Sequence, residues 1–437
     1  MSGNALSSVA SQTKKRPAQE DSDQASASKI AKTHPFFNKQ LQPSSPAEQK
    51  FQWLKPLGGT GSCLHGVNLS PKASKAVAAF DLDGTVIKSD FVKKISVPQW
   101  EWWRSGVPAK LQEVHESGYS IVIISNQGVK PQVLKAWKHK IPLIADALPT
   151  VPFRIFAATS KDNYRKPMIG MWSELERIFA EEGVEIDKSA SFFVGDAAGR
   201  QYPGRKADFA STDRKWAINV GLPFYTPEEY FLGLPPHTNF TLPGFNASSL
   251  PKLPHVMPSS SPLLPDPLKQ EVVLFVGYPC LGKSSFFRHH FRPADYVHVN
   301  QDILKTRDKC VKHTQEALEN GQSCVIDNTN RNASTRKYYI DLAKRLKVPI
   351  RCFLFSGSIE LAWHNNLYRA YNLPPSVSSK EPSRDIVPYT AFSGFRGAYE
   401  EPRLDEGFSE IKTVNWVFEG SEDEKKYWSM WLQIDGK

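Results

Sequence analysis

The sequence predicts an α/β protein with two domains, each a parallel sheet flanked by helices. Short apolar runs of strand length alternate with longer segments of helical periodicity from about residue 51 onward, which is typical of parallel sheets covered by helices. A stretch rich in Pro and Ser, residues 234–267, interrupts this alternation and predicts an extended linker. We therefore expect one domain at 51–233 and a second at 268–437.

Composition is consistent with this division. The chain has 437 residues, enough for about two domains. Its formal net charge of +10 and pI near 9.1 favour an anionic partner such as nucleic acid, although a basic surface can also serve solubility alone. The five cysteines are an odd number without paired spacing, which predicts reduced thiols. No apolar run reaches membrane-spanning length and no signal peptide opens the chain, so we expect a soluble intracellular protein without a membrane partner.

Residues 1–50 contain few large apolar side chains and are expected to be disordered. The cluster Lys14-Lys15-Arg16-Pro17, with Lys29 and Lys32 downstream, has the composition of a nuclear-localisation signal. Short basic runs are also common by chance. The expected location is the nucleus.

The first domain is organised around Asp81-Leu82-Asp83-Gly84-Thr85, directly after an apolar run at 76–80. An unpaired charge at the end of a buried strand is costly unless a cation compensates it. One carboxylate could attack a phosphorus atom while the other protonates the leaving oxygen, with both near a divalent cation. The alternative is an acidic turn without a chemical role.

Further polar residues follow apolar runs in the same half. Ser125 ends the run 121–124, Lys166 lies in a turn-like Arg-Lys-Pro stretch, and Asp196 follows the run 191–194. Taken singly, Ser125 and Lys166 could be an ordinary turn residue and a solvated charge.

Together these motifs resemble those of the haloacid dehalogenase superfamily of aspartyl-phosphate phosphatases. The resemblance implies that Ser125 and Lys166 hold the transferring phosphoryl group and that Asp196 joins Asp81 and Asp83 at a magnesium ion. Many relatives carry a second acid a few residues after the first one in the last motif. The nearest acids here are Asp208 and Asp213, and their roles stay open.

Other elements of this domain follow from periodicity and capping. We expect helices at 107–117 and 171–182, a late strand at 216–221 and a helix from Thr226 with Pro at its first position. The aromatic cluster before the first helix favours core packing over base stacking; it comprises Trp100, Trp102 and Trp103.

The second domain opens on a strand-like run followed by a phosphate-binding motif. Gly277, Gly282, Lys283 and Ser284 match Gly-x-x-x-x-Gly-Lys-Ser at every fixed position, before a helix expected near Ser285. Such glycines let backbone amides turn towards phosphates, and the helix N-terminus adds positive potential. The lysine would reach the β- and γ-phosphates of ATP, and the Ser284 hydroxyl would ligate magnesium.

Three further residues of this domain are candidates, and two of them have a second interpretation. Asp302 follows a short strand and could accept a proton from a hydroxyl, or simply cap a helix. Asp327 stands where P-loop proteins often carry a second acid. Arg369, on a helix expected at 359–371, could reach over the phosphates as a lid or be a solvated charge.

The order of phosphatase, Pro-rich joint and P-loop kinase resembles the eukaryotic polynucleotide kinase 3′-phosphatase family. Matching stretches include Asp327-Asn328-Thr329-Asn330 and His364-Asn365-Asn366. The resemblance implies a haloacid dehalogenase-like domain and a P-loop kinase domain that use Mg²⁺ and ATP to make DNA ends ligatable, by removing 3′-phosphates and phosphorylating 5′-hydroxyls. It also implies roles for Asp81 and Asp83 as nucleophile and general acid/base, Asp302 as kinase base and Arg369 as lid arginine. Animal members carry an N-terminal forkhead-associated domain, which does not fit in the short tail here; recruitment by repair-scaffold proteins would then depend on the tail itself.

Two other classes remain open from the sequence. A metabolite enzyme that fuses a sugar- or histidinol-phosphate phosphatase to a small-molecule kinase would keep every motif but not a nucleic-acid surface. A catalytically inactive DNA-binding scaffold is disfavoured because all expected catalytic residues are present.

Overall fold

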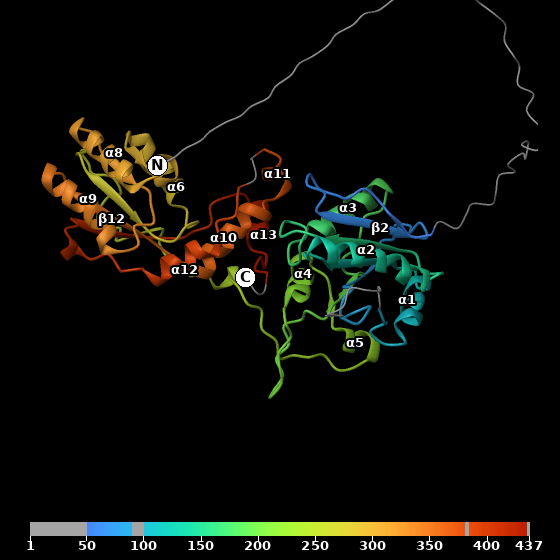
Figure 1. The fold of residues 1–437 in the computed structure, drawn as a ribbon. Coiled ribbons are helices and arrows are strands. Elements are labelled where there is room, and N and C mark those ends of the chain that lie inside the picture. The colour runs from blue at the N-terminus through green and yellow to red at the C-terminus, as the bar shows by residue number, and fades with distance from the viewer. Residues whose placement is uncertain (1–49, 90–99, 381–383, 435–437) are drawn as a thin grey trace, which may run out of the picture. The chain divides into compact units, whose positions relative to one another are not determined.

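The computed structural model describes residues 50–89, 100–380 and 384–434 (Figure 1). These residues belong to one compact unit, Glu48–Lys437, that contains two separate sheets. The predicted disordered tail and its basic cluster lie outside the described residues.

The first sheet has seven strands in the order β1-β2-β5-β4-β3-β6-β7. Strands β3 to β7 are parallel to one another, whereas β1 and β2 form an antiparallel edge in which β2 pairs with β5. The strands are β1 Gln52–Trp53, β2 Cys63–Asn68, β3 Val77–Phe80, β4 Ser120–Asn126, β5 Phe153–Ala158, β6 Phe192–Val194 and β7 Phe224–Tyr225. The helices are α1 Val107–Glu116, α2 Pro131–Asp146, α3 Gly170–Glu181, α4 Thr212–Val220 and α5 Pro227–Leu232.

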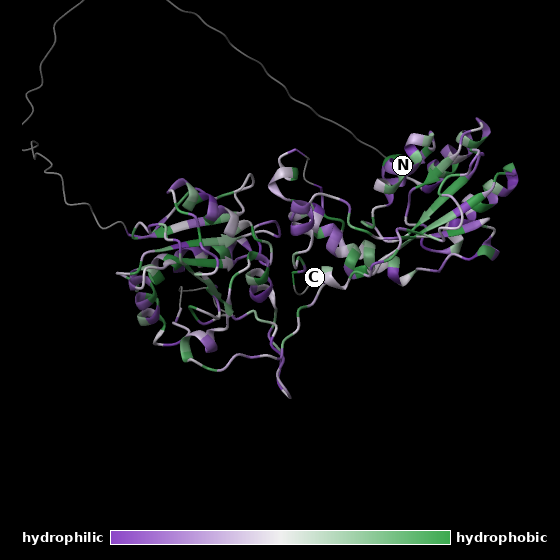
Figure 2. Cartoon of the chain, turned by 180° about the vertical axis from the view of Figure 1, so that it is seen from behind, coloured by the Kyte–Doolittle hydropathy of each residue, from purple (hydrophilic) through white to green (hydrophobic). Residues whose placement is uncertain are grey.

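Helices cover both faces of this sheet. Leu111 of α1 and Ile141 of α2 belong to one buried apolar cluster, and Leu175 of α3 and Trp216 of α4 belong to another. Figure 2 shows the apolar strands between helices whose outer faces are hydrophilic. The three Trp residues that begin at Trp100 pack against the first cluster, as the sequence favoured.

The predicted helices at 107–117 and 171–182 are confirmed as α1 and α3, and α5 has the predicted Thr226 cap. The predicted strand at 216–221 is wrong, because these residues form the end of α4 and its cap. Trp216, Ala217 and Val220 are buried at helical spacing, and Gly221 ends the helix at φ +86°. A short apolar run fits both periodicities, and packing of this face against the sheet favours the helix.

The second sheet has six strands in the order β10-β11-β9-β12-β13-β8 and is parallel except for β8. Its strands are β8 Val256–Met257, β9 Val272–Val276, β10 Val297–Val299, β11 Cys324–Ile326, β12 Ile350–Ser356 and β13 Glu410–Asn415. Its helices are α6 Lys283–Phe286, α7 Gln301–Leu304, α8 Arg307–Glu319, α9 Ala333–Leu346, α10 Ile359–Tyr371, α11 Pro375–Ser378, α12 Tyr389–Gly397 and α13 Glu422–Trp428.

The Pro-rich segment is not wholly irregular. Its residues Val256–Met257 form β8, which pairs with β13 as the antiparallel edge of the second sheet. The five cysteines are all free thiols. Within the described ranges, no helix is long and apolar enough to cross a membrane.

Candidate active sites

The first candidate site lies at the carboxyl edge of the seven-stranded sheet. Asp81 follows β3 directly, Ser125 lies near the end of β4, and Asp196 lies just beyond β6. Phe80 of β3 is in register with Val194 of β6, and the Asp81 amide donates to the Val194 carbonyl at 2.8 Å. The strands therefore bring these predicted site residues to one edge, where ligands bind in open parallel sheets.

Lys166 supplies the positive charge of this site. Its Nζ lies 2.6 Å from Asp81 Oδ1 and 2.7 Å from Asp213 Oδ1, and it donates to the Ile124 carbonyl at 2.8 Å. The lysine side chain is only 1% exposed. Burial opposes the charged form, but the two carboxylates outweigh it and raise the pKa of Lys166. A buried ammonium is thus held against the predicted nucleophile.

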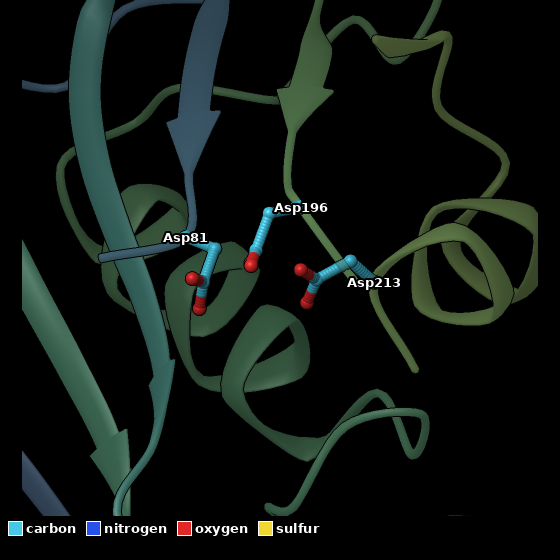
Figure 3. Close-up of side chains that lie close together, drawn as sticks. All are labelled: Asp81, Asp196 and Asp213. Carbon is cyan, nitrogen blue, oxygen red and sulfur yellow. The ribbon is translucent and has the colours of Figure 1, made fainter. Parts of the chain in front are cut away.

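Three carboxylates converge beside this lysine. One oxygen each from Asp81, Asp196 and Asp213 lies within 4.8 Å of the others. Figure 3 shows the three side chains pointing toward one another. Burial raises the pKa of Asp81 to about 7 although Lys166 opposes the shift, and burial together with Asp81 and Asp213 raises the pKa of Asp196. One ammonium does not balance three acids, and clustered carboxylate oxygens are the ligands that Mg²⁺ prefers. The donor set therefore fits a divalent cation.

Asp213 is the site residue that the sequence did not assign. It lies in the first turn of α4, and its Oδ2 accepts a hydrogen bond from the Ala197 amide at 3.0 Å. The mistaken strand at 216–221 hid its position at the start of a helix. The combination of an acid in a first turn and Gly221 at the end of the periodic run was the available signal.

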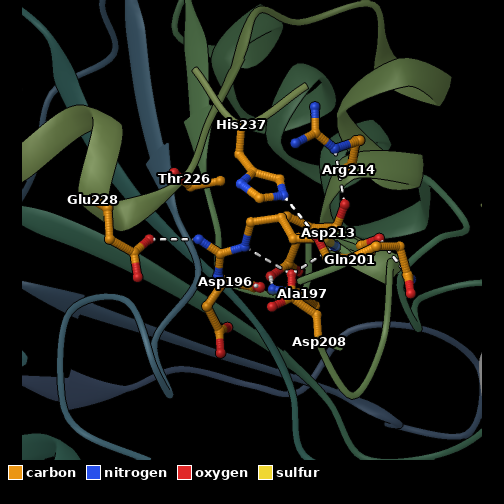
Figure 4. Close-up of polar contacts among 12 residues, drawn as sticks. Asp196, Ala197, Gln201, Asp208, Asp213, Arg214, Thr226, Glu228 and His237 are labelled. Carbon is orange, nitrogen blue, oxygen red and sulfur yellow. Dashed lines mark hydrogen bonds and ion pairs between the residues drawn. The ribbon is translucent and has the colours of Figure 1, made fainter. Parts of the chain in front are cut away.

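Asp208, the other unassigned acid, has a different partner. Its Oδ2 lies 2.8 Å from Nε of Arg200, whose Nη1 lies 2.6 Å from Glu228 and whose Nη2 donates to the Asp196 carbonyl at 3.3 Å (Figure 4). The Arg200 side chain is buried. Asp208 thus helps to hold the loop that carries Asp196, and it is not part of the carboxylate group.

Asp83 also lies outside that group. Its Oδ2 accepts a hydrogen bond from Gln127 Nε2 at 2.5 Å, and the same nitrogen donates to Ser125 Oγ at 3.0 Å. The neighbouring Asn126 exchanges two hydrogen bonds with the main chain of Lys166, at 2.9 and 3.1 Å. The stretch from Ser125 to Gln127 therefore connects the loop that carries Asp81 and Asp83 to Lys166.

The second candidate site is formed by the loop between β9 and α6. Gly277 and Gly282 have φ values of +154° and +84°. The value at position 282 lies in the left-handed region, which glycine adopts more readily than other residues. Lys283 Nζ donates to the carbonyls of Gly277 and Tyr278 at 3.1 and 2.5 Å. Burial lowers the pKa of Lys283 to about 8 although Asp327 opposes the shift. The helix starts at Lys283, two residues before the predicted start.

Asp327 anchors the floor of this site directly after β11. It accepts hydrogen bonds from Ser284 Oγ at 2.5 Å and Asn300 Nδ2 at 3.2 Å, and lies 2.9 Å from His298 Nε2. Burial alone would raise the pKa of Asp327, but the bonds from His298 and Ser284 lower it. An ionised acid thus contacts the predicted magnesium ligand Ser284.

A cavity of about 1070 Å³ opens beside the loop, and its lining includes Lys283, Ser285, Asp302 and Arg369. The cap of α7 is Asn300, whose Oδ1 accepts from the Asp302 amide at 2.8 Å. The interpretation of Asp302 as the helix cap is therefore wrong, and its carboxylate is available to the cavity. Arg369, on α10, has a buried Nε without a hydrogen-bond partner among the described residues.

The fold and these two sites define an enzyme of phosphoryl transfer with a carboxylate phosphatase centre in one half and a P-loop kinase centre in the other. A family model described as polynucleotide kinase 3 phosphatase matches residues 76–231. A second, described as an AAA domain, matches residues 272–381.

Relatives match either nearly the whole chain or a part of it. The bifunctional polynucleotide phosphatase/kinase of Schizosaccharomyces pombe is 37% identical, over 97% of this chain and 100% of the relative. The polynucleotide 3′-phosphatase ZDP of Arabidopsis thaliana is 36% identical over 36% of this chain and 24% of its own length. The chain belongs to the bifunctional polynucleotide phosphatase/kinase family.

Proposed function

We propose that this enzyme removes 3′-phosphates from DNA ends through an aspartyl-phosphate and phosphorylates 5′-hydroxyl ends with ATP, so that strand breaks become ligatable. The observation that carries the phosphatase half is the buried contact of 2.6 Å between Lys166 Nζ and Asp81. This ammonium opposes the rise that burial causes in the pKa of Asp81, and it can stay in contact with the phosphoryl group that the carboxylate attacks. The names of the relatives in S. pombe and A. thaliana support polynucleotide ends as the substrate.

The phosphatase residues divide the work as follows. An Asp81 oxygen attacks the phosphorus, and the bond from phosphorus to the 3′-oxygen breaks. Asp83 donates its proton to that leaving oxygen, then takes a proton from the water that hydrolyses the acyl phosphate and regenerates Asp81. Ser125 and Lys166 hold the phosphoryl oxygens, and Gln127 orients Asp83 through its bond of 2.5 Å.

Asp81, Asp196 and Asp213 would hold a magnesium ion at this centre. When bound, the ion offsets the negative charge of carboxylates and phosphate. The pKa of Asp81 and of Asp196 is raised by burial and neighbouring acids, so this charge is not balanced by the protein alone.

In the kinase half, the loop from Gly277 to Gly282 would surround the phosphates of ATP, with Lys283 at the β- and γ-phosphates. Asp302 would accept the proton of the 5′-hydroxyl while the hydroxyl oxygen attacks the γ-phosphorus and the bond from this phosphorus to ADP breaks. Arg369, with a buried Nε that lacks a partner among the described residues, would stabilise the charge on the transferring group. Ser284 would hold the magnesium of the nucleotide.

Two substitutions test the assignment of one activity to each site. Asp81→Asn should abolish phosphatase turnover and spare the kinase, because an amide is a far weaker nucleophile. Lys283→Ala should have the opposite effect. Both are measured on a nicked duplex that carries a 3′-phosphate and a 5′-hydroxyl, with circular dichroism as the control for folding. Loss of both activities in a folded single variant contradicts two independent centres.

A metabolite phosphatase/kinase is the other candidate function. Competition of the phosphatase assay by unrelated DNA distinguishes the two, since only a polynucleotide enzyme should be inhibited.

We also propose that the enzyme acts in the nucleus, directed by the basic cluster at residues 14–17. Fusion of residues 1–50 to a fluorescent protein tests this. Replacement of Lys14, Lys15 and Arg16 with Ala should disperse a nuclear signal, and an unchanged distribution contradicts the proposal.

A further inference from the structure

A half-buried arginine, two of whose nitrogens lack an acceptor among the described residues, lies next to the catalytic lysine. Arg165 precedes Lys166, and its Nε and Nη1 are buried without a hydrogen-bond partner in the described part of the chain. Burial lowers the pKa of Arg165 although Asp162 opposes the shift. Buried guanidinium donors are costly when no acceptor meets them, and almost all are satisfied in folded proteins. An acceptor from outside the protein is therefore expected.

The guanidinium lies against the loop between β4 and α2. A Cβ built on Gly128 would be 2.8 Å from Arg165 Nη1 and 3.6 Å from its Cζ. Only a glycine allows this approach of the guanidinium to the backbone. The residue before Gly128 is Gln127, whose side chain binds Asp83. Arg165 is thus placed one residue beyond the group that orients the general acid.

This position defines which part of a substrate Arg165 can meet. Asp83 marks the side of the leaving oxygen, which belongs to the terminal sugar of a polynucleotide. The sugar carries the next phosphodiester at its other end. The transferring phosphoryl group is already met by Lys166, whose Nζ points to Asp81, whereas Arg165 faces Gly128. Lys130, which is exposed at the start of α2 and follows Gly128 by two residues, adds a further positive charge to the loop that Arg165 contacts.

We infer that Arg165 binds the phosphodiester next to the terminal 3′-phosphate and so makes the phosphatase site prefer polynucleotides over mononucleotides. The inference rests on the proposed 3′-phosphatase function and adds a specificity residue to it. A guanidinium can bind two phosphate oxygens at once, which an ammonium cannot.

Two substrates with the same leaving group test the inference. Thymidine 3′-monophosphate has no phosphodiester, and a thymidine dinucleotide with a 3′-phosphate has one. For wild-type enzyme, kcat/KM should favour the dinucleotide. Arg165→Met should lower this preference roughly 10- to 100-fold, the usual value of a charged hydrogen bond, mainly by raising KM for the dinucleotide. Arg177→Met, which removes an exposed arginine paired with Glu174 and Glu181 on α3, should leave both rates unchanged.

A salt titration and a second variant separate binding from packing. On a longer 3′-phosphorylated oligonucleotide, Arg165→Met should reduce the slope of log KM against log salt by about 0.7, as expected for one lost contact to a single strand. Gly128→Ala keeps the charge but displaces the guanidinium, and it should also lower the dinucleotide preference. Retention of the preference in both variants would overturn the inference, and so would equal losses on the two substrates. If wild-type enzyme hydrolyses neither nucleotide, the proposed function itself fails.

Discussion

Gln127→Leu offers a direct test of how Asp83 acts. Gln127 is 6% exposed, and its amide donates to Asp83 Oδ2 at 2.5 Å and to Ser125 Oγ at 3.0 Å. Leucine keeps much of the volume and leaves no orphan donor in its place. The bond to Asp83 strengthens as this residue gives up its proton, so it stabilises the transition state more than the ground state.

The size of the effect follows from that bond. A hydrogen bond to a charged group contributes about 1.5–3 kcal/mol, which corresponds to roughly a 10- to 100-fold loss in rate at about 1.4 kcal/mol per tenfold. The loss should appear with thymidine 3′-monophosphate, because its 3′-oxygen is a poor leaving group unless an acid gives it a proton. It should be small with p-nitrophenyl phosphate, whose leaving group departs as an anion without help from an acid.

The assay compares kcat on the two substrates for wild type and variant. Gln112→Leu is the matched control, since it removes an amide that donates to a carboxylate, Glu116, on the surface of α1. Equal losses on both substrates would refute the reasoning, because they would mean that Gln127 serves Ser125 or the fold rather than proton transfer to the leaving group.

Three further outcomes are expected. Asp302→Asn should lower kinase kcat by roughly 10²-fold or more with ATP affinity unchanged, and a fully active variant would remove Asp302 from the mechanism. Asp213→Asn should raise the magnesium concentration needed for half-maximal phosphatase activity at least about tenfold; an unchanged requirement would exclude Asp213 as a ligand. Burial lowers the pKa of His364 to about 4. As the pH falls, the unfolded chain therefore takes up a proton on this histidine before the folded chain does. The free energy of unfolding should then decrease by up to about 3 kcal/mol between pH 6.5 and 4. In urea titrations His364→Gln should lose part of this pH dependence, and identical profiles would contradict the assignment.

Local signals in the sequence predicted much of the chemistry of the two sites and part of their geometry. Asp81, Asp196 and Ser284 each follow an apolar strand or a glycine loop, and polar residues in those contexts identify phosphoryl-transfer chemistry before any coordinates are known. Parallel strands must also end at one edge of a sheet, so the meeting of Asp81, Ser125 and Asp196 could be predicted from order alone.

The contacts that complete the sites depend on residues far apart in the chain. Asp213 approaches Lys166 because α4 packs its Trp216 face on the sheet, and the short run at 216–221 matched a strand as well as a helix. Asn300, rather than Asp302, caps α7 because its side chain also reaches Asp327 on the neighbouring strand end. Two donors of Arg165, beside Gly128, lack a partner among the residues that the structure describes, and no sequence signal indicates this. Periodicity reports burial within one element, whereas these pairings depend on how separate elements pack, and only the tertiary structure decides that.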